Sequence, residues 1–170
     1  MPEPARASFI HLHNHSDFSL LKGASPIGGM VARAQELGMD ALAITDDGNL
    51  FGALNFYMAC KKAGIKPIVG CDFYLAPGER RSRSGLENPN RLSRLVLLAR
   101  NNGGYRSLIN LTSIGYTEGF YYKPRVDDEV LQQHTDGVIA LSGSLSGDIP
   151  RLILANKIEE AERRAAWYRE

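Results

Sequence analysis

Histidines that could bind a metal ion lie near the amino terminus, within Phe9–His15. Apolar and polar side chains alternate from Phe9 to His13, which predicts a short strand, and no helical periodicity follows it. In an extended chain, His13 and His15 point to the same face and can bind one ion through neutral nitrogens. His11 shares this parity but is expected deeper in the strand. The alternative is that these histidines are polar strand-end residues that hydrogen-bond to the backbone.

Carboxylates accompany two later strands of the predicted fold. Ala41–Thr45 is a continuous apolar run, typical of a buried parallel strand, and Asp46 and Asp47 follow it directly. Asp72 lies within the predicted strand Pro67–Tyr74, where an unpaired carboxylate would be costly to bury. We therefore expect either a cation or several hydrogen-bond donors to face Asp72.

The elements that must position these residues alternate along the chain. The predicted strands cover residues 9–13, 41–45, 67–74, 94–99 and 138–142. The predicted helices cover residues 26–37, 50–63, 105–116, 127–133 and 157–170. In the second helix, the spacing of Phe51, Leu54 and Met58 predicts the buried face. Five strands separated by helical segments indicate an α/β fold with a parallel sheet or a barrel, and no glycine-rich or Walker-type nucleotide loop is present.

Composition limits the class of protein further. A chain of 170 residues with 44% hydrophobic content can bury one sizeable core, which predicts a single domain. The net charge of +1 gives no global attraction to nucleic acid. The two cysteines, Cys60 and Cys71, do not form a disulfide framework, so a reducing, cytoplasmic setting is expected. No apolar run approaches the roughly 20 residues that cross a bilayer, so we expect no membrane contact.

Basic residues cluster in two segments, an irregular stretch at 76–90 and an aromatic stretch at 120–125. The basic residues concerned are Arg80, Arg81, Arg83, Lys123 and Arg125. They could contact nucleic-acid phosphates, with the neighbouring tyrosines stacking on bases. Alternatively, the first segment is a solvated loop and the second packs against the fold. We favour this second interpretation for both segments.

Six segments of the chain resemble one known family, and they occur in the family's order. They are His11–Leu21, Ala43–Asp46 with Gly48–Leu50, Gly64–Gly70, Leu97–Asn101, Tyr121–Arg125 and Leu141–Gly143. The family is the PHP (polymerase and histidinol phosphatase) domain found at the amino terminus of bacterial DNA polymerase III alpha subunits. The resemblance implies a distorted (β/α)7 TIM-like barrel, incomplete here, with residues 1–170 forming most of the domain. It also implies a cluster of two or three metal ions at the strand ends, which hydrolyses phosphoesters in active relatives.

The resemblance also shows where this chain departs from the family's metal ligands. His13 and His15 match the first ligand pair, and Asp72 stands in place of a glutamate. The replaced positions are Lys22 for aspartate, Asp47 for histidine, Arg94 for histidine and Ser144 for cysteine. We expect Lys22, Arg94 and Ser144 to be ion-pair replacements of the family's ligands. The last ligand pair, an Asp-x-His, would lie beyond the end of this sequence. Because lysine and arginine side chains only donate hydrogen bonds, we expect the two cations to pair with the two carboxylates where ions would sit.

Two functions follow as hypotheses. In the first, the chain is a structural domain without a cofactor, which contacts the rest of a polymerase chain and docks a proofreading exonuclease subunit. In the second, it is a metal-dependent phosphoesterase or 3′-to-5′ exonuclease, with Zn²⁺ or Mn²⁺ held by His13, His15 and Asp72. The resemblance implies that the full-length chain is a Mg²⁺-dependent DNA polymerase acting in DNA replication, with its palm residues outside this sequence. The two basic segments would add a DNA-binding surface.

Overall fold

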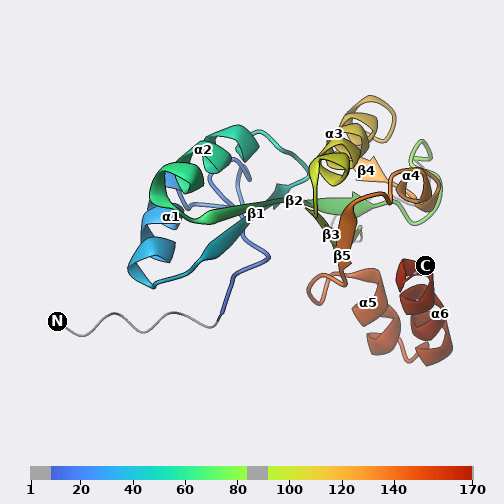
Figure 1. Cartoon of the computed structure of the whole chain (residues 1–170). Coiled ribbons are helices and arrows are strands. Elements are labelled where there is room, and N and C mark those ends of the chain that lie inside the picture. The colour runs from blue at the N-terminus through green and yellow to red at the C-terminus, as the bar shows by residue number, and fades with distance from the viewer. Residues whose placement is uncertain (1–8, 84–91, 170) are drawn as a thin grey trace.

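A mixed five-stranded sheet forms the centre of the computed structural model, which describes residues 9–83 and 92–169 (Figure 1). The strands are β1 (Ala41–Asp47), β2 (Lys66–Leu75), β3 (Ser93–Ala99), β4 (Arg125–Val126) and β5 (Val138–Leu141). They are ordered β1-β2-β3-β5, and the short β4 pairs with the end of β2. Long β2 therefore contacts three other strands, and its register places Asp47 directly opposite Asp72.

The direction of the strands differs in part from the predicted parallel arrangement. β1 and β4 run parallel to β2, as predicted for an α/β fold, but β2 pairs antiparallel with β3, and β3 pairs antiparallel with β5. Antiparallel neighbours need no crossover helix, and the described residues between β2 and β3 contain none. Among the described residues the sheet stays open, so the α/β class is confirmed and a closed barrel is not observed.

Six helices flank the sheet over the described part of the chain. They are α1 (Ile27–Glu36), α2 (Ala53–Ala63), α3 (Asn102–Thr117), α4 (Asp128–Gln133), α5 (Asp148–Leu154) and α6 (Ile158–Arg169). One core lies between α1, α2 and β1, where Val31, Ile44 and Phe56 are buried. A second core lies between the sheet and α3, where Leu95 and Leu108 are buried. None of these helices combines the length and apolar character needed to cross a bilayer.

The amino-terminal segment is extended but is not a strand. Residues 9–15 have no regular secondary structure, which corrects the predicted strand at 9–13. Their backbone nevertheless lies along the outer edge of β1, because Ala43 N donates to the His11 carbonyl at 3.1 Å and Thr45 N donates to the Asn14 carbonyl at 2.8 Å. These two bonds hold the histidines beside the end of β1.

Helix α2 buries a different face from the one predicted. Phe51, Leu54 and Met58 are 65%, 66% and 62% exposed, whereas Phe56 and Cys60 are fully buried. Both faces of α2 carry apolar side chains at helical spacing, so periodicity alone cannot decide between them. The sheet and α1 pack against the Phe56 face, and the predicted face is left at the surface.

Candidate functional site

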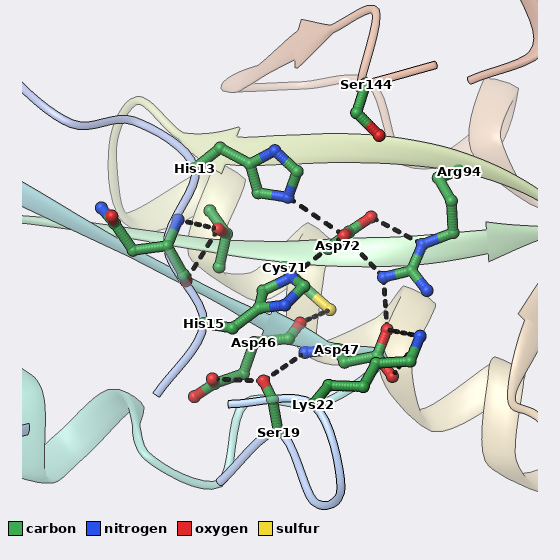
Figure 2. A network of polar contacts seen from close by, with 12 residues as sticks. His13, His15, Ser19, Lys22, Asp46, Asp47, Cys71, Asp72, Arg94 and Ser144 are labelled. Carbon is green, nitrogen blue, oxygen red and sulfur yellow. Dashed lines mark hydrogen bonds and ion pairs between the residues drawn. The ribbon is translucent and has the colours of Figure 1, made fainter. Parts of the chain in front are cut away.

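The charged centre of the site is a guanidinium group between two carboxylates (Figure 2). Arg94 Nε donates to Asp72 Oδ1 at 3.0 Å, and Arg94 Nη2 forms ion pairs with Asp72 Oδ2 at 2.5 Å and with Asp47 Oδ1. The three side chains are 9%, 4% and 6% exposed for Arg94, Asp72 and Asp47. Asp47 and Asp72 are register partners on β1 and β2, and Arg94 enters from the start of β3. One buried cation therefore bridges both acids.

A second cation, Lys22, contacts the Asp47 carboxylate from the loop before α1. Lys22 Nζ lies 3.2 Å from Asp47 Oδ2 and donates to the Tyr74 hydroxyl at 2.8 Å. The Tyr74 hydroxyl in turn donates to Asp47 Oδ2 at 2.6 Å. The loop turns so tightly here that only glycine fits at position 23, since a Cβ on Gly23 would lie 1.9 Å from the Ser16 carbonyl oxygen. Asp47 is thus surrounded by two cations and a phenol.

Tyr74 is a site residue that the sequence reasoning missed. It lies two residues after Asp72 on β2, so its side chain shares the face of that carboxylate. Its ring also packs under the Arg94 guanidinium, 4.0 Å from ring centroid to Cζ. The two-residue periodicity of the strand is the signal that could have identified it.

Asp46 does not join this centre, although it immediately precedes Asp47. Its buried carboxylate accepts hydrogen bonds from Ser16 N and Ser16 Oγ, both at 2.7 Å, and from Ser19 Oγ at 2.6 Å. Successive side chains on a strand point to opposite faces, which separates the two aspartates. Asp46 therefore anchors the loop that joins the histidines to Lys22.

The two histidines both contact one oxygen of the Asp72 carboxylate. His13 Nε2 and His15 Nε2 each lie 3.1 Å from Asp72 Oδ2, and the ligand atoms of all three residues lie within 4.8 Å of one another. Two imidazoles and a carboxylate are donors that suit one divalent ion. However, Oδ2 is also the atom that Arg94 contacts, and Asp47 is occupied by cations. The residues present fit a single ion and do not fit a cluster.

Ser144 lies near the site but outside its ion pairs. It stands above His13 and Arg94 in Figure 2, on the loop after β5. Its Oγ hydrogen-bonds to Ser146 Oγ at 3.0 Å, and its side chain is exposed. A serine hydroxyl has no charge to contribute, so we correct its place among the ion-pair replacements: Ser144 is a neutral substitution.

The surroundings of the carboxylates fix their charge. Burial alone would raise the pKa of Asp72, but hydrogen bonds from His13, His15 and Arg94 outweigh burial and hold that pKa well below its usual range. For Asp47, burial is outweighed by the Tyr74 hydrogen bond and by the positive charges beside it, so its pKa is also lowered. Both acids are therefore ionised wherever the protein is folded near neutral pH.

These lowered pKa values predict that acid destabilises the protein. The unfolded chain, with ordinary aspartate pKa values of about 3.9, binds protons before the folded chain does. The contribution of Asp47 and Asp72 is thus complete above that value, and it is lost progressively as the pH falls from that value toward the lowered pKa values of the folded protein. Urea unfolding at pH 7, 5, 4 and 3 should show this loss, and Asp72→Asn should show a shallower one. Equal slopes for the two proteins would contradict the assignment to Asp72.

Two of the five basic residues predicted to contact nucleic acid are buried in the protein. Arg80 binds Glu118 and Glu129, with Nε and Nη1 donating at 2.8 and 2.7 Å, and it also pairs with Asp127. Arg125 is 1% exposed and donates from Nε to the Gly119 carbonyl at 2.8 Å. These internal partners use both guanidinium groups, which corrects the predicted DNA contacts at these two positions.

The other three basic residues stay closer to solvent. Arg81 is exposed and pairs with Glu118 at 2.6 Å, and Arg83 is exposed beside the Tyr121 ring. Lys123 is half-buried, with Nζ 5.5 Å from the centroid of the Tyr74 ring. Nucleic-acid contact therefore stays a prediction for Arg81, Arg83 and Lys123. Residues 84–90 of the predicted loop lie outside the described residues.

Comparison with known proteins gives the family of this chain. The family model described as PHP domain matches residues 11–170. The chain belongs to the PHP domain family. This PHP domain is 52% identical to DNA polymerase III subunit alpha of Treponema pallidum over 165 residues and 46% identical to that of Borreliella burgdorferi over 164 residues. These matches cover 97% and 96% of the chain but 14% of each relative, so the chain spans about one seventh of their length.

Among solved structures, an amidohydrolase from Chromobacterium violaceum with bound SO4 and no metal is similar to this PHP domain with a TM-score of 0.46. The two sequences are 23% identical. The match covers 62% of this chain and 32% of the amidohydrolase.

Proposed function

We propose that this PHP domain is a structural domain of a DNA polymerase III alpha chain, in which ion pairs replace the family's metal cluster. The observation that carries the proposal is the Arg94 guanidinium, which contacts Asp47 and Asp72 at once. Lys22 completes the replacement from the other side of Asp47. In this proposal the pocket keeps its shape and its buried charges. The polar network also links β1, β2 and β3 to the amino-terminal segment.

Phosphoester hydrolysis in metal-dependent enzymes needs bound ions, and this ion-pair network leaves no room for a metal cluster. Metal-dependent phosphoesterases use bound ions to lower the pKa of water and to stabilise charge on phosphate oxygens. Here two cationic side chains occupy the space beside the carboxylates, and they repel further divalent ions. Arg94 and Lys22 also consume the lone pairs of Asp47 that a second ion would need.

A second candidate function rests on the remaining ligand group. His13, His15 and Asp72 would hold one Zn²⁺ or Mn²⁺, which supplies Lewis acidity when bound. In that case both imidazoles and the Asp72 carboxylate would face the ion, and Arg94 would keep Asp72 ionised and contact a phosphate. This would give a phosphoesterase or a 3′-to-5′ exonuclease.

The wider setting follows from the relatives. The relatives are DNA polymerase III alpha subunits, which supports a role for the full-length chain in DNA replication, as a Mg²⁺-dependent nucleotidyltransferase in the cytoplasm. Residues 1–170 would form most of its amino-terminal domain. Partners would be the remainder of the polymerase chain, a proofreading exonuclease subunit and, through the whole protein, DNA.

A cleavage assay separates the two functions. Labelled single-stranded DNA is incubated with Mn²⁺ or Zn²⁺ and either this protein or His13→Ala. We expect the unmodified protein to release no more nucleotides than His13→Ala does. The histidine variant removes one ligand of the candidate ion and serves as the matched control for contaminating nucleases. Cleavage that depends on His13 would overturn the structural assignment and favour the phosphoesterase.

A further inference from the structure

An apolar patch covers the surface between the start of α2 and the end of α3. It consists of Phe51, Leu54, Met58, Tyr116 and Phe120, and we call it the α2–α3 patch. The Phe51 and Tyr116 ring centroids are 6.2 Å apart, and the Tyr116 and Phe120 rings stack at 6.0 Å. Figure 1 shows α2 and α3 both above the sheet in that view. Contiguous exposed apolar side chains of this kind mark interaction surfaces.

The charged residues on the two helices that carry the patch have one sign, and Glu118, which follows α3, is paired with Arg80 and Arg81. Neither α2 nor α3 contains an aspartate or a glutamate, and their charged residues are Lys61, Lys62 and Arg106. Lys61 and Lys62 follow Met58 by three and four residues on α2, so they border the patch on the same side of the helix. In contrast, α4 and α6 each have two acidic residues in their first turn. A partner of the patch must therefore combine apolar and acidic groups.

The types of side chain indicate which macromolecule this partner is. Single-stranded nucleic acid binds through aromatic rings that stack on bases, together with cations that follow its backbone. Leu54 and Met58 offer no ring, yet they are among the most exposed members of the patch. Flexible methionine and leucine side chains beside aromatic rings are typical of surfaces that bind an amphipathic helix. The composition thus favours a protein partner.

We propose that the α2–α3 patch binds an acidic amphipathic helix of a partner protein. The apolar face of that helix covers Phe51, Leu54 and Tyr116, and its acidic residues pair with Lys61 and Lys62. The inference rests on the proposed function, since a structural domain acts through the surfaces that it offers. The two fail separately, because the cleavage assay reports on His13 and the binding test below reports on α2.

The test uses a fluorescein-labelled peptide of about 16 residues with leucine and phenylalanine on one helical face and glutamate on the other. We expect saturable binding by fluorescence anisotropy, and binding at least about tenfold weaker for Phe51→Ser/Leu54→Ser. Leu154→Ser, at an equally exposed leucine on α5, is the matched control and should bind normally. Lys61→Glu/Lys62→Glu, which leaves the apolar residues intact, should also weaken binding.

Each other outcome counts against the proposal. Equal binding of a peptide with lysine in place of glutamate, or no binding of the acidic peptide, would overturn it. Binding of oligo(dT) that Phe51→Ser/Leu54→Ser abolishes would assign the patch to nucleic acid instead. Self-association in sedimentation experiments that the same variant abolishes would assign it to a second copy of the chain.

Discussion

Replacing Arg94 with alanine will lower the free energy of unfolding by about 3–5 kcal/mol, the usual effect of removing one partner from a buried ion pair. The variant leaves Asp47 and Asp72 buried and opposite each other on paired strands, with their shared cation gone. Repulsion between the two carboxylates and the loss of their hydrogen bonds act in the same direction. Lys22 still reaches Asp47 but does not contact Asp72.

Urea denaturation at neutral pH measures this loss. Arg33→Ala is the matched control, because Arg33 pairs with Glu36 at the surface of α1, where both side chains are largely exposed. Surface pairs of this kind contribute about 0–1 kcal/mol. A similar, small effect for both variants would show that the Arg94 network contributes little to the fold.

Restoring the family's ligand types will create a tight metal site. The triple variant Lys22→Asp, Asp47→His and Arg94→His removes both cations and adds an anionic and two neutral donors beside His13, His15 and Asp72. We expect its affinity for Zn²⁺ or Mn²⁺ to exceed that of the unmodified protein by about 100-fold or more, since replacement of ligand-supporting groups alone changes affinity by about 10–100-fold.

Isothermal titration with each metal measures the gain. The control is the triple variant combined with His13→Ala, which keeps the new donors but loses one original ligand and should bind more weakly. Circular dichroism checks that the variants remain folded before metal is added. An unchanged affinity in a folded triple variant would mean that the pocket has lost its shape as well as its ligands.

Local pattern was sufficient for most of the elements. Apolar runs located β1, β2, β3 and β5, and glycine positions located the ends of α1 and α2, with Gly38 and Gly64 in the left-handed conformation. Sequence pattern also placed Asp46 and Asp47 at the end of β1 and Asp72 within β2. These features depend on contacts between residues that are close in the chain.

The features that sequence pattern could not predict depend on contacts between residues far apart in the chain. The direction of β3 depends on its pairing with β2. Phe51 and Leu54 are exposed because the sheet and α1 pack against the opposite face of α2. Arg80 resembles a loop cation in sequence, yet acidic residues 38 to 49 positions further on bury and pair it. The involvement of Tyr74 was accessible in principle, through its two-residue spacing from Asp72.

Metal content distinguishes a pocket filled by ion pairs from a pocket filled by metal ions. Protein purified without chelators and without added metal should be analysed by inductively coupled plasma mass spectrometry, with the triple variant as the positive control. We predict at most one divalent ion per chain for the unmodified protein, because Lys22 and Arg94 occupy the rest of the pocket. Two or three tightly bound ions per chain would contradict the account.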